Sequence, residues 1–326
     1  MSLQWQHTRL MVIGDAMIDR YIWGKTERIS PEAPVPVLNW LQDENRLGGA
    51  ANVALNARAL GLDVALCAMS GTDENAELLQ TLCAHDQIDG SYLYRSKQRP
   101  TSVKTRILSG QQHLLRVDRE DTRLIEAEDI REIMPLWQKA LEEFTPQVVI
   151  LQDYNKGLLH PKLIEWVIQK CQEENIFVAV DPKKEFIQHY TGVDLFKPNL
   201  KELSQFLNRE VSPSMESLTQ AASDLRKELS FKNLIVTLSE HGIFYQNDQG
   251  DCGIAPTRPR PIVDVCGAGD AVITIAAVAL HNGFPIDQTA RLCNIAGGQV
   301  CGSVGVSTLT LETIEKEWSD SQTKIS

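Results

Sequence analysis

The sequence predicts an α/β sandwich with three layers, in which helices cover a mainly parallel central sheet and a small β-sheet is appended. Most strand candidates are short and almost entirely apolar, as in strands buried on both faces, and helical patterns separate them. The segments 20–41 and 91–118 break this alternation because each contains several strand candidates in succession. We therefore expect one domain over 1–326, with these two segments pairing into the small sheet.

The first elements follow from local patterns. Residues 9–14 (RLMVIG) form a β-rich run that ends at a glycine. Strand candidates at 20–25 and 35–41 flank TERISPEAP, in which two prolines and a serine exclude a helix. After the glycine pair at 48–49, Ala, Val and Leu recur at helical spacing, which predicts a helix that ends at Gly61.

In the rest of the chain, predicted strands alternate with predicted helices. The exception is 91–118, where apolar and polar residues follow each other in turn, as they do in antiparallel strands. The further predicted strands are 63–69, 147–151, 177–181, 194–198 and 233–238, with a hairpin near 243–254. The further predicted helices are 74–85, 126–143, 161–174, 200–207, 214–229, 267–281 and 286–302.

Composition excludes several classes of protein. The 326 residues include 32 Lys and Arg and 43 Asp and Glu, which gives a formal net charge of −11. This charge argues against nucleic acid or an anionic membrane as the main partner. The longest uncharged apolar stretch, 271–280, has about half the ~20 residues that a bilayer-spanning helix needs. No secretory signal is visible, and the seven cysteines contain no C-x-x-C pair. We expect a soluble cytoplasmic protein.

One loop before a helix has unusual chemistry. A strand-like segment, 263–265, leads through Cys266 into Gly267, Ala268 and Gly269, and an apolar helix begins at once. The glycines permit a tight turn with unpaired N–H groups, and the helix dipole adds positive charge, so the loop suits a phosphate. Asp270, in the first turn, is placed to take a proton from an attacking hydroxyl.

The same residues fit a plain turn followed by a helix-favouring acid equally well. The chain contains neither GxxxxGK[ST] nor GxGxxG, which disfavours P-loop nucleotide hydrolases and nicotinamide dehydrogenases.

Three further groups follow strands or open helices. Gly48 and Gly49 again offer open N–H groups, and Asn52 an amide for hydroxyls, although close packing of helix and strand explains the glycines as well. Asp19, four residues after Asp15, is a candidate for binding sugar hydroxyls or a simple turn former.

Asn199 and Glu202 are three residues apart, so they share a helix face and suit a hydrated Mg²⁺. An N-cap followed by a solvated Glu is the alternative.

Together these motifs resemble a known family. GGAANVALNARALG (48–61) and DVCGAGDAV (264–272) are similar to the two signatures of the ribokinase-like (PfkB) carbohydrate kinases. PNLKE and TLSEHG match further family elements, and the likeness covers about 9–306 in the expected order. The resemblance implies an ATP-dependent sugar kinase with the ribokinase-like fold, in which the small sheet is a lid over the sugar.

A narrower resemblance concerns the substrate. GDAMIDRYIWGKTERISPEAPVPV, SVKTRILSGQQHLLRVD, LQDYNKG and VDPKK resemble the kinase domain of the heptose-7-phosphate kinase/ADP-heptose synthase group. That group phosphorylates the anomeric hydroxyl of D-glycero-D-manno-heptose 7-phosphate for lipopolysaccharide synthesis. Bifunctional members add a nucleotidyltransferase domain. The chain has no H-x-G-H motif, so we expect the kinase alone, acting beside a separate nucleotidyltransferase.

The resemblance implies roles for individual residues. Asp270 is the base, and Gly267, Ala268 and Gly269 form the anion hole. The implied ATP contacts are Lys183, Asn199, Glu202, Thr237, Ser239, Glu240, Gly242 and Asn294. The implied substrate contacts are Asp19, Gly48, Gly49, Asn52, Lys104, Arg106, Arg116, Asp153 and Lys156.

The implied cofactors are ATP and Mg²⁺, the metal being organised by Asn199 and Glu202 through water, and Asp264 is the candidate ligand for a monovalent cation such as K⁺. The resemblance also implies a homodimer joined through the lid.

This sequence departs from the family pattern at several positions. Cys266 and Ala271 stand where the signature usually has hydroxyl or branched residues, Lys184 where the heptose group usually has Gly, and Lys197 where it often has Thr. Another sugar acceptor, such as a ketohexose, a pentose or a nucleoside, and a catalytically silent binding protein therefore remain alternatives.

Overall fold

The computed structural model of the protein describes residues 3, 5, 7–110, 112–257, 263–302, 305 and 307–323. The strands are β1 (Arg9–Gly14), β2 (Ala16–Ile29), β3 (Pro36–Gly49), β4 (Asp63–Cys67), β5 (Met69–Ser70), β6 (Tyr94–Arg95), β7 (Val103–Ser109), β8 (Gln112–Arg119), β9 (Val148–Gln152), β10 (Phe177–Asp181), β11 (Val193–Phe196), β12 (Phe231–Thr237), β13 (Ile243–Asn247) and β14 (Cys252–Ala255). The helices are α1 (Ala50–Ala59), α2 (Glu74–His85), α3 (Ala127–Phe144), α4 (Pro161–Glu173), α5 (Leu200–Phe206), α6 (Met215–Glu228), α7 (Ala268–His281), α8 (Ile286–Val300) and α9 (Leu311–Thr323). Short 3₁₀ helices lie at Lys184–His189 and Ser239–His241.

The central sheet has the strand order β14-β13-β12-β11-β10-β9-β1-β4. Neighbouring strands from β12 to β4 run parallel, and β13 and β14 continue the sheet as an antiparallel hairpin. The predicted mainly parallel sheet is confirmed. Because its parallel strands all end at one edge, the loops that follow them converge there.

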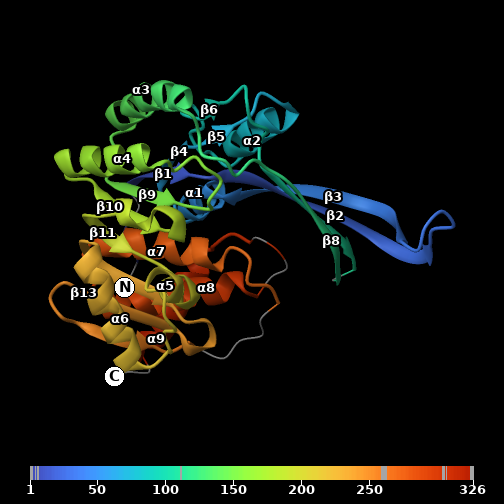
Figure 1. Ribbon diagram of the computed structural model, residues 1–326. Coiled ribbons are helices and arrows are strands. Elements are labelled where there is room, and N and C mark those ends of the chain that lie inside the picture. The colour runs from blue at the N-terminus through green and yellow to red at the C-terminus, as the bar shows by residue number, and fades with distance from the viewer. Residues whose placement is uncertain are drawn as a thin grey trace.

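Alternate residues of the central strands face two separate hydrophobic cores, as the period of a β-strand requires. On β1, Leu10 and Val12 pack in the core that includes α1, α7 and α8. Met11 and Ile13 face the opposite core, to which α3 and α4 contribute. Figure 1 shows α3 and α4 on one side of the sheet and α7 and α8 on the other, so the predicted layers of the sandwich are confirmed.

The small sheet, called the lid sheet below, has the order β3-β2-β7-β8 and projects from the body as an arm (Figure 1). Strands β2 and β3 are antiparallel, and β2 runs parallel to β7. Both hairpin strands are longer than predicted, since β2 begins at Ala16 and β3 continues to Gly49. The prolines of the connection occupy its turn, where Ser30 N donates to Val35 O at 2.9 Å.

Three other elements differ from the prediction. Within 91–118, β6 pairs with β5 and lies outside the lid sheet. Residues 263–265 are not a strand; there the Val263 N–H donates to the Cys301 carbonyl at 2.9 Å. Helix α9 was not predicted, because its sequence is mostly polar and Ile314 and Trp318 are its buried apolar residues in the described part.

None of the described helices combines the length and apolar character that crossing a membrane requires.

Candidate active site

A cleft of about 750 Å³ lies at the carboxyl ends of the parallel strands. Each strand of this region contributes the residues at or just after its end, and α7 contributes its first turn. The polar lining residues are Gln152, Tyr154, Asp181, Lys183, Lys197, Asn199, Lys201, Glu202, Ser204, Glu210, Thr237, Ser239 and Asp270. This is the edge at which an open parallel sheet collects its ligands.

Helix α7 begins at this cleft. Gly267 has a φ of 79°, in the left-handed region that favours glycine, and Ala271 N donates to its carbonyl at 3.0 Å. The Ala268 N–H donates to the Val265 carbonyl at 3.3 Å, whereas Gly269 and Asp270 line the cleft. The start of α7 therefore presents its positive dipole end to the cleft, as an anion receptor requires.

Asp270 is buried and receives hydrogen bonds from two distant parts of the chain. Asn52 Nδ2, on α1, donates to Asp270 Oδ2 at 2.7 Å, and the Tyr154 hydroxyl donates to Asp270 Oδ1 at 2.7 Å. Gln152 Nε2 makes a longer contact of 3.4 Å to Oδ1. The structure thus brings together Asn52 and Asp270, which the sequence motifs singled out separately.

Burial raises the pKa of Asp270 to about 6, and the neighbouring charge of Asp181 raises it as well. The hydrogen bonds from Asn52 and Tyr154 and the charge of Lys197 act in the opposite direction. A carboxyl group with a pKa near neutrality is suited to general base catalysis, because it is ionised at neutral pH yet accepts a proton readily.

A buried ion pair lies next to Asp270. Lys197 Nζ is 3.0 Å from Asp181 Oδ2, and Gln152 Nε2 donates to the same oxygen at 3.2 Å. A Cβ atom at Gly269 would lie 3.9 Å from both Lys197 Nζ and Asp181 Oδ2, so the pair abuts the first turn of α7. The Lys197 ammonium therefore adds positive charge beside the start of α7.

Asn199 and Glu202 cap helix α5 reciprocally. Glu202 N donates to Asn199 Oδ1 at 2.8 Å, and Asn199 N donates to Glu202 Oε2 at 2.9 Å. The other Glu202 oxygen accepts from Lys183. Among the described residues, no group of three or more His, Cys, Asp and Glu side chains is arranged to hold a metal ion. Carboxylate and amide oxygens beside a polar cleft still suit Mg²⁺ that keeps its water shell.

The predicted nucleotide residues separate into two groups. Thr237 and Ser239 line the cleft. Glu240 is exposed, and Gly242, with a φ of 93°, ends the 3₁₀ turn where a Cβ would lie 2.1 Å from the Ala255 carbonyl oxygen. Asn294 Nδ2 donates to that same carbonyl at 2.8 Å. Glu240, Gly242 and Asn294 are not among the described residues that line the cleft.

The predicted sugar contacts lie where the lid sheet meets the body. Asp19 on β2 is buried and paired with Arg106 on β7. A Cβ at Gly48 would lie 2.3 Å from Asp19 Oδ2, so glycine is required for this approach. Gly49, with a φ of 60°, leads directly from β3 into α1. Asp19 is near enough to the cleft for its charge to contribute to the raised pKa of Tyr154, of which burial is the main cause.

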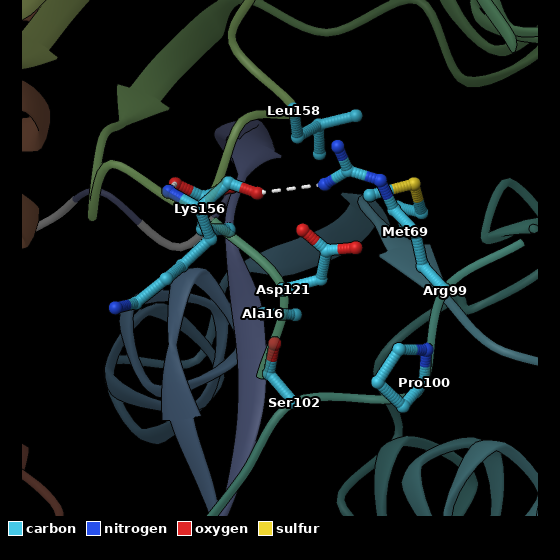
Figure 2. A pocket seen from close by; sticks show the side chains of 9 residues that line it. Ala16, Met69, Arg99, Pro100, Ser102, Asp121, Lys156 and Leu158 are labelled. Carbon is cyan, nitrogen blue, oxygen red and sulfur yellow. Dashed lines mark hydrogen bonds between the residues drawn. The ribbon is translucent and has the colours of Figure 1, made fainter. Parts of the chain in front are cut away.

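Two further predicted cations interact electrostatically: Lys104, on β7 of the lid sheet, and Lys156, in the loop after β9. Burial lowers the pKa of Lys104, and so does the charge of Lys156, whose Nζ is 2.7 Å from Glu120 Oε1. Figure 2 shows the Lys156 carbonyl accepting from Arg99 beside a pocket of about 10 Å³, while its ammonium points away from that pocket. Arg116 is exposed, and its Nε donates to Asp118 at 2.9 Å.

Two candidates have their carboxylates engaged elsewhere. Asp153 accepts from the Tyr190 hydroxyl at 2.9 Å and from Asn155 N at 2.7 Å, outside the described lining of the cleft. Asp264 accepts from the backbone N–H groups of Cys266 and Gly305 at 3.0 and 2.9 Å.

Four residues of the cleft were not predicted from sequence motifs: Gln152, Tyr154 and Asp181 belong to none of the predicted sites, and Lys197 stood out only as a departure from the family pattern. Each is a polar residue that ends or follows an apolar strand, at the edge where ligands collect. A systematic search of every strand end would have included them.

The family model described as pfkB family carbohydrate kinase matches residues 7–314. "Bifunctional protein HldE" of Trichlorobacter lovleyi is 36% identical over 321 residues, covering 97% of this chain and 65% of that protein. The HldE protein of Helicobacter hepaticus is 38% identical over 310 residues, covering 95% and 63%. The chain thus spans just under two thirds of the length of these relatives.

Solved structures are similar in fold. Phosphofructokinase-2 from Escherichia coli, in complex with substrates and products, aligns with a TM-score of 0.79 at 18% identity, covering 96% of this chain and 99% of that one. Arabidopsis thaliana ribokinase, complexed with ribose and ATP, aligns with a TM-score of 0.71 at 19% identity, covering 95% and 98%. The ribokinase-like fold is confirmed. The chain belongs to the pfkB family of carbohydrate kinases, which are phosphotransferases with an alcohol group as acceptor.

Proposed function

We propose that the protein transfers the γ-phosphoryl group of ATP to the anomeric hydroxyl of D-glycero-D-manno-heptose 7-phosphate, in the cytoplasm. The observation that carries the kinase assignment is Asp270, buried at the start of α7 and held by Asn52 and Tyr154 at the edge of a large cleft. The heptose assignment is supported by the motifs shared with the heptose-7-phosphate kinase group and by the similarity to the HldE proteins.

The nucleotide side of the reaction uses charge and dipoles. We assign the ATP phosphates to the part of the cleft between the start of α7 and the residues that follow β10 and β11. There Lys183 and Lys197 provide positive charge, and the Gly269 backbone belongs to the anion receptor. When bound, Mg²⁺ would neutralise charge on the phosphates, with Asn199 and Glu202 holding its water shell.

The acceptor side requires a base. Asp270 takes the proton of the acceptor hydroxyl while that oxygen forms its bond to the γ-phosphorus and ADP leaves. Asp19 and Asn52 are assigned to the sugar hydroxyls. Closure of the lid sheet over the sugar would exclude water and limit wasteful hydrolysis of ATP.

The phosphate already present on the sugar needs cations. Lys104 and Arg106 lie on β7 of the lid sheet, and the charge of Lys156 acts on Lys104. We assign the 7-phosphate to these three cations, with Arg116 as an outer contact. In a protein of net charge −11, such a local group of cations is what a sugar phosphate requires.

We also infer a homodimer formed through the lid sheet. Large apolar side chains are exposed on its strands, where an unpartnered monomer would leave them in water: Ile29, Trp40, Leu41, Leu115 and Val117.

The test is ADP release from Mg-ATP with heptose 7-phosphate, fructose 6-phosphate, ribose or no sugar, using wild type and Asp270→Asn. We expect turnover with heptose 7-phosphate that Asp270→Asn reduces by at least about a thousandfold, with ATP binding retained. Preferred turnover of another sugar would overturn the heptose assignment. Absence of sugar-dependent ADP release would overturn the kinase assignment for this chain.

A further inference from the structure

We propose that Tyr154 is a positioning residue for phosphoryl transfer: its hydroxyl fixes Oδ1 of Asp270 and keeps the carboxyl group in its basic form, so that Oδ2 receives the acceptor's proton. This inference deepens the proposed function and rests on Asp270 being the base. Neither the sequence motifs nor the family comparison assigns a role to Tyr154.

The two oxygens of Asp270 have different surroundings. Oδ1 accepts from the Tyr154 hydroxyl at 2.7 Å and from Gln152 Nε2 at 3.4 Å. For Oδ2, the described contacts contain one hydrogen bond, from Asn52 Nδ2 at 2.7 Å. Because a carboxylate oxygen can accept two hydrogen bonds, Oδ2 can still accept one from an incoming hydroxyl. Oδ1 already accepts from both Tyr154 and Gln152.

Tyr154 is itself held on two sides. Its backbone N–H donates to Asp15 Oδ2 at 2.9 Å, which fixes the start of the loop after β9. The Lys183 ammonium lies 5.8 Å from the centre of the Tyr154 ring, within the range of a cation–π contact. These two contacts fix the Tyr154 side chain at the wall of the cleft, in the position from which its hydroxyl donates to Asp270.

The charges around Asp270 explain why such a donor is needed. Burial and the charge of Asp181, on β10, favour the protonated form of Asp270 and raise its pKa to about 6. Lys197, after β11, and the hydrogen bonds from Asn52 and Tyr154 favour the carboxylate. Burial, Asp270, Asp181 and Asp19 together hold the pKa of Tyr154 well above its usual value, so the phenol remains a donor.

The chemical step then needs no proton from Tyr154. The acceptor O–H bond breaks and its proton moves to Asp270 Oδ2, while the acceptor oxygen bonds to the γ-phosphorus. The bond from that phosphorus to the bridging oxygen of ADP breaks, and ADP leaves with the bonding electrons. Tyr154 keeps its proton and its hydrogen bond to Oδ1 throughout.

The test compares Tyr154→Phe with Tyr190→Phe. Tyr190 is a matched control, because it is buried and its hydroxyl also donates to an aspartate, Asp153 Oδ2, at 2.9 Å, outside the described lining of the cleft. Both variants remove one tyrosine hydroxyl that donates to a buried aspartate. The pH dependence of kcat/KM for heptose 7-phosphate is measured for wild type and both variants, and thermal unfolding confirms that each is folded.

We expect the acidic limb of the Tyr154→Phe profile to move upward by about one pH unit, which is about a tenfold loss of kcat/KM on that limb. At alkaline pH the variant should approach wild type, and KM for ATP should not change. The acidic limb of the Tyr190→Phe profile should not shift. If Tyr154→Phe lowered kcat/KM by the same factor at every pH, or did not lower it at all, the proposal would be overturned.

A second measurement separates this inference from the proposed function. The titration of the Asp270 carboxyl carbon is followed by ¹³C NMR without substrate and is assigned by its loss in Asp270→Asn. Its midpoint should rise in Tyr154→Phe and not in Tyr190→Phe, whether or not a sugar is turned over. An unmoved midpoint refutes the role of Tyr154 even in an active kinase. If Tyr154→Phe does not fold, replacing Tyr154 by 3,5-difluorotyrosine, a stronger donor, should lower the midpoint, and no change would refute the role.

Discussion

The Lys197 ammonium lies 3.0 Å from Asp181 Oδ2, and both side chains are more than nine-tenths buried. The pair abuts the first turn of α7, and Gln152 links Asp181 to Asp270. A buried charge pair of this kind adds little stability over an apolar pair, but it is costly to break on one side. Its position beside the proposed anion receptor gives the pair a functional reason to be retained.

Lys197→Met should therefore destabilise the protein by about 3–5 kcal/mol, because it leaves the Asp181 carboxylate buried without its partner. Adding Asp181→Asn should restore most of the lost free energy of unfolding, measured by urea denaturation, while kinase activity stays low in the double variant. Full recovery of activity in the double variant would show that the Lys197 charge has no part in catalysis.

Asp270→Asn should stabilise the folded protein at alkaline pH while it abolishes turnover. The pKa of Asp270 is raised to about 6 in the folded state. The contribution of this carboxyl group to the free energy of unfolding is therefore fully present below its unfolded pKa and is lost as the pH rises through about 6. Between pH 5 and pH 8 wild type should lose about 1.4 kcal/mol that the Asn variant keeps. Urea denaturation at both pH values measures this difference. Parallel curves for the two proteins would contradict the raised pKa.

Gly48→Ala should impair sugar binding and spare ATP binding. The new Cβ would lie 2.3 Å from Asp19 Oδ2 and would push that carboxylate away from Arg106. We expect KM for the sugar to rise about tenfold or more, as for the loss of a hydrogen bond to a charged group. Gly90→Ala is the control, because a Cβ there would lie 3.4 Å from its nearest described neighbour, Leu93 Cδ1, and neither residue belongs to the described lining of the cleft. An equal rise in both variants would count against Asp19 as a sugar contact.

Trp40→Glu should dissociate the proposed dimer. Trp40 is 63% exposed on β3, and a charge there would be buried without a partner in a lid-to-lid interface. Met215→Glu places the same charge on an exposed apolar residue of α6, away from the lid sheet, and should leave the assembly intact. Sedimentation velocity distinguishes the two, and a wild-type monomer would refute the dimer directly.

The sequence was sufficient for the central sheet because its strands are buried on both faces. Their continuous apolar runs and the glycines that end β1 and α1 are local signals. The lid sheet was only partly predictable. Half of the residues of β3 and most of those of β8 are exposed, so no buried face imposes a clear alternation on them. Helix α9 is similarly polar, and its few buried residues do not produce a strong helical period.

The candidate site was also only partly predictable from the sequence. Local motifs marked Asp270 with its glycines, and Asn52, as candidates, although each motif alone also fits a purely structural role. Their contact depends on the packing of α1 against α7, which no local pattern encodes. The proposed roles of Tyr154 and Gln152 depend on the position of β9 in the sheet, between β1 and β10. Neighbours in space, rather than along the chain, determine the charge and orientation of the proposed base.

Asp270 follows Asn52 by 218 positions, which also has a consequence for the newborn polypeptide. At a ribosomal rate of about 5–20 residues per second, the aspartate is synthesised roughly 11–44 seconds after the asparagine. The lid hairpin and the first strands of the sheet thus exist before the reactive carboxyl group does. A nascent chain of this protein can assemble its proposed sugar contacts early, but it cannot consume ATP before Asp270 has been translated.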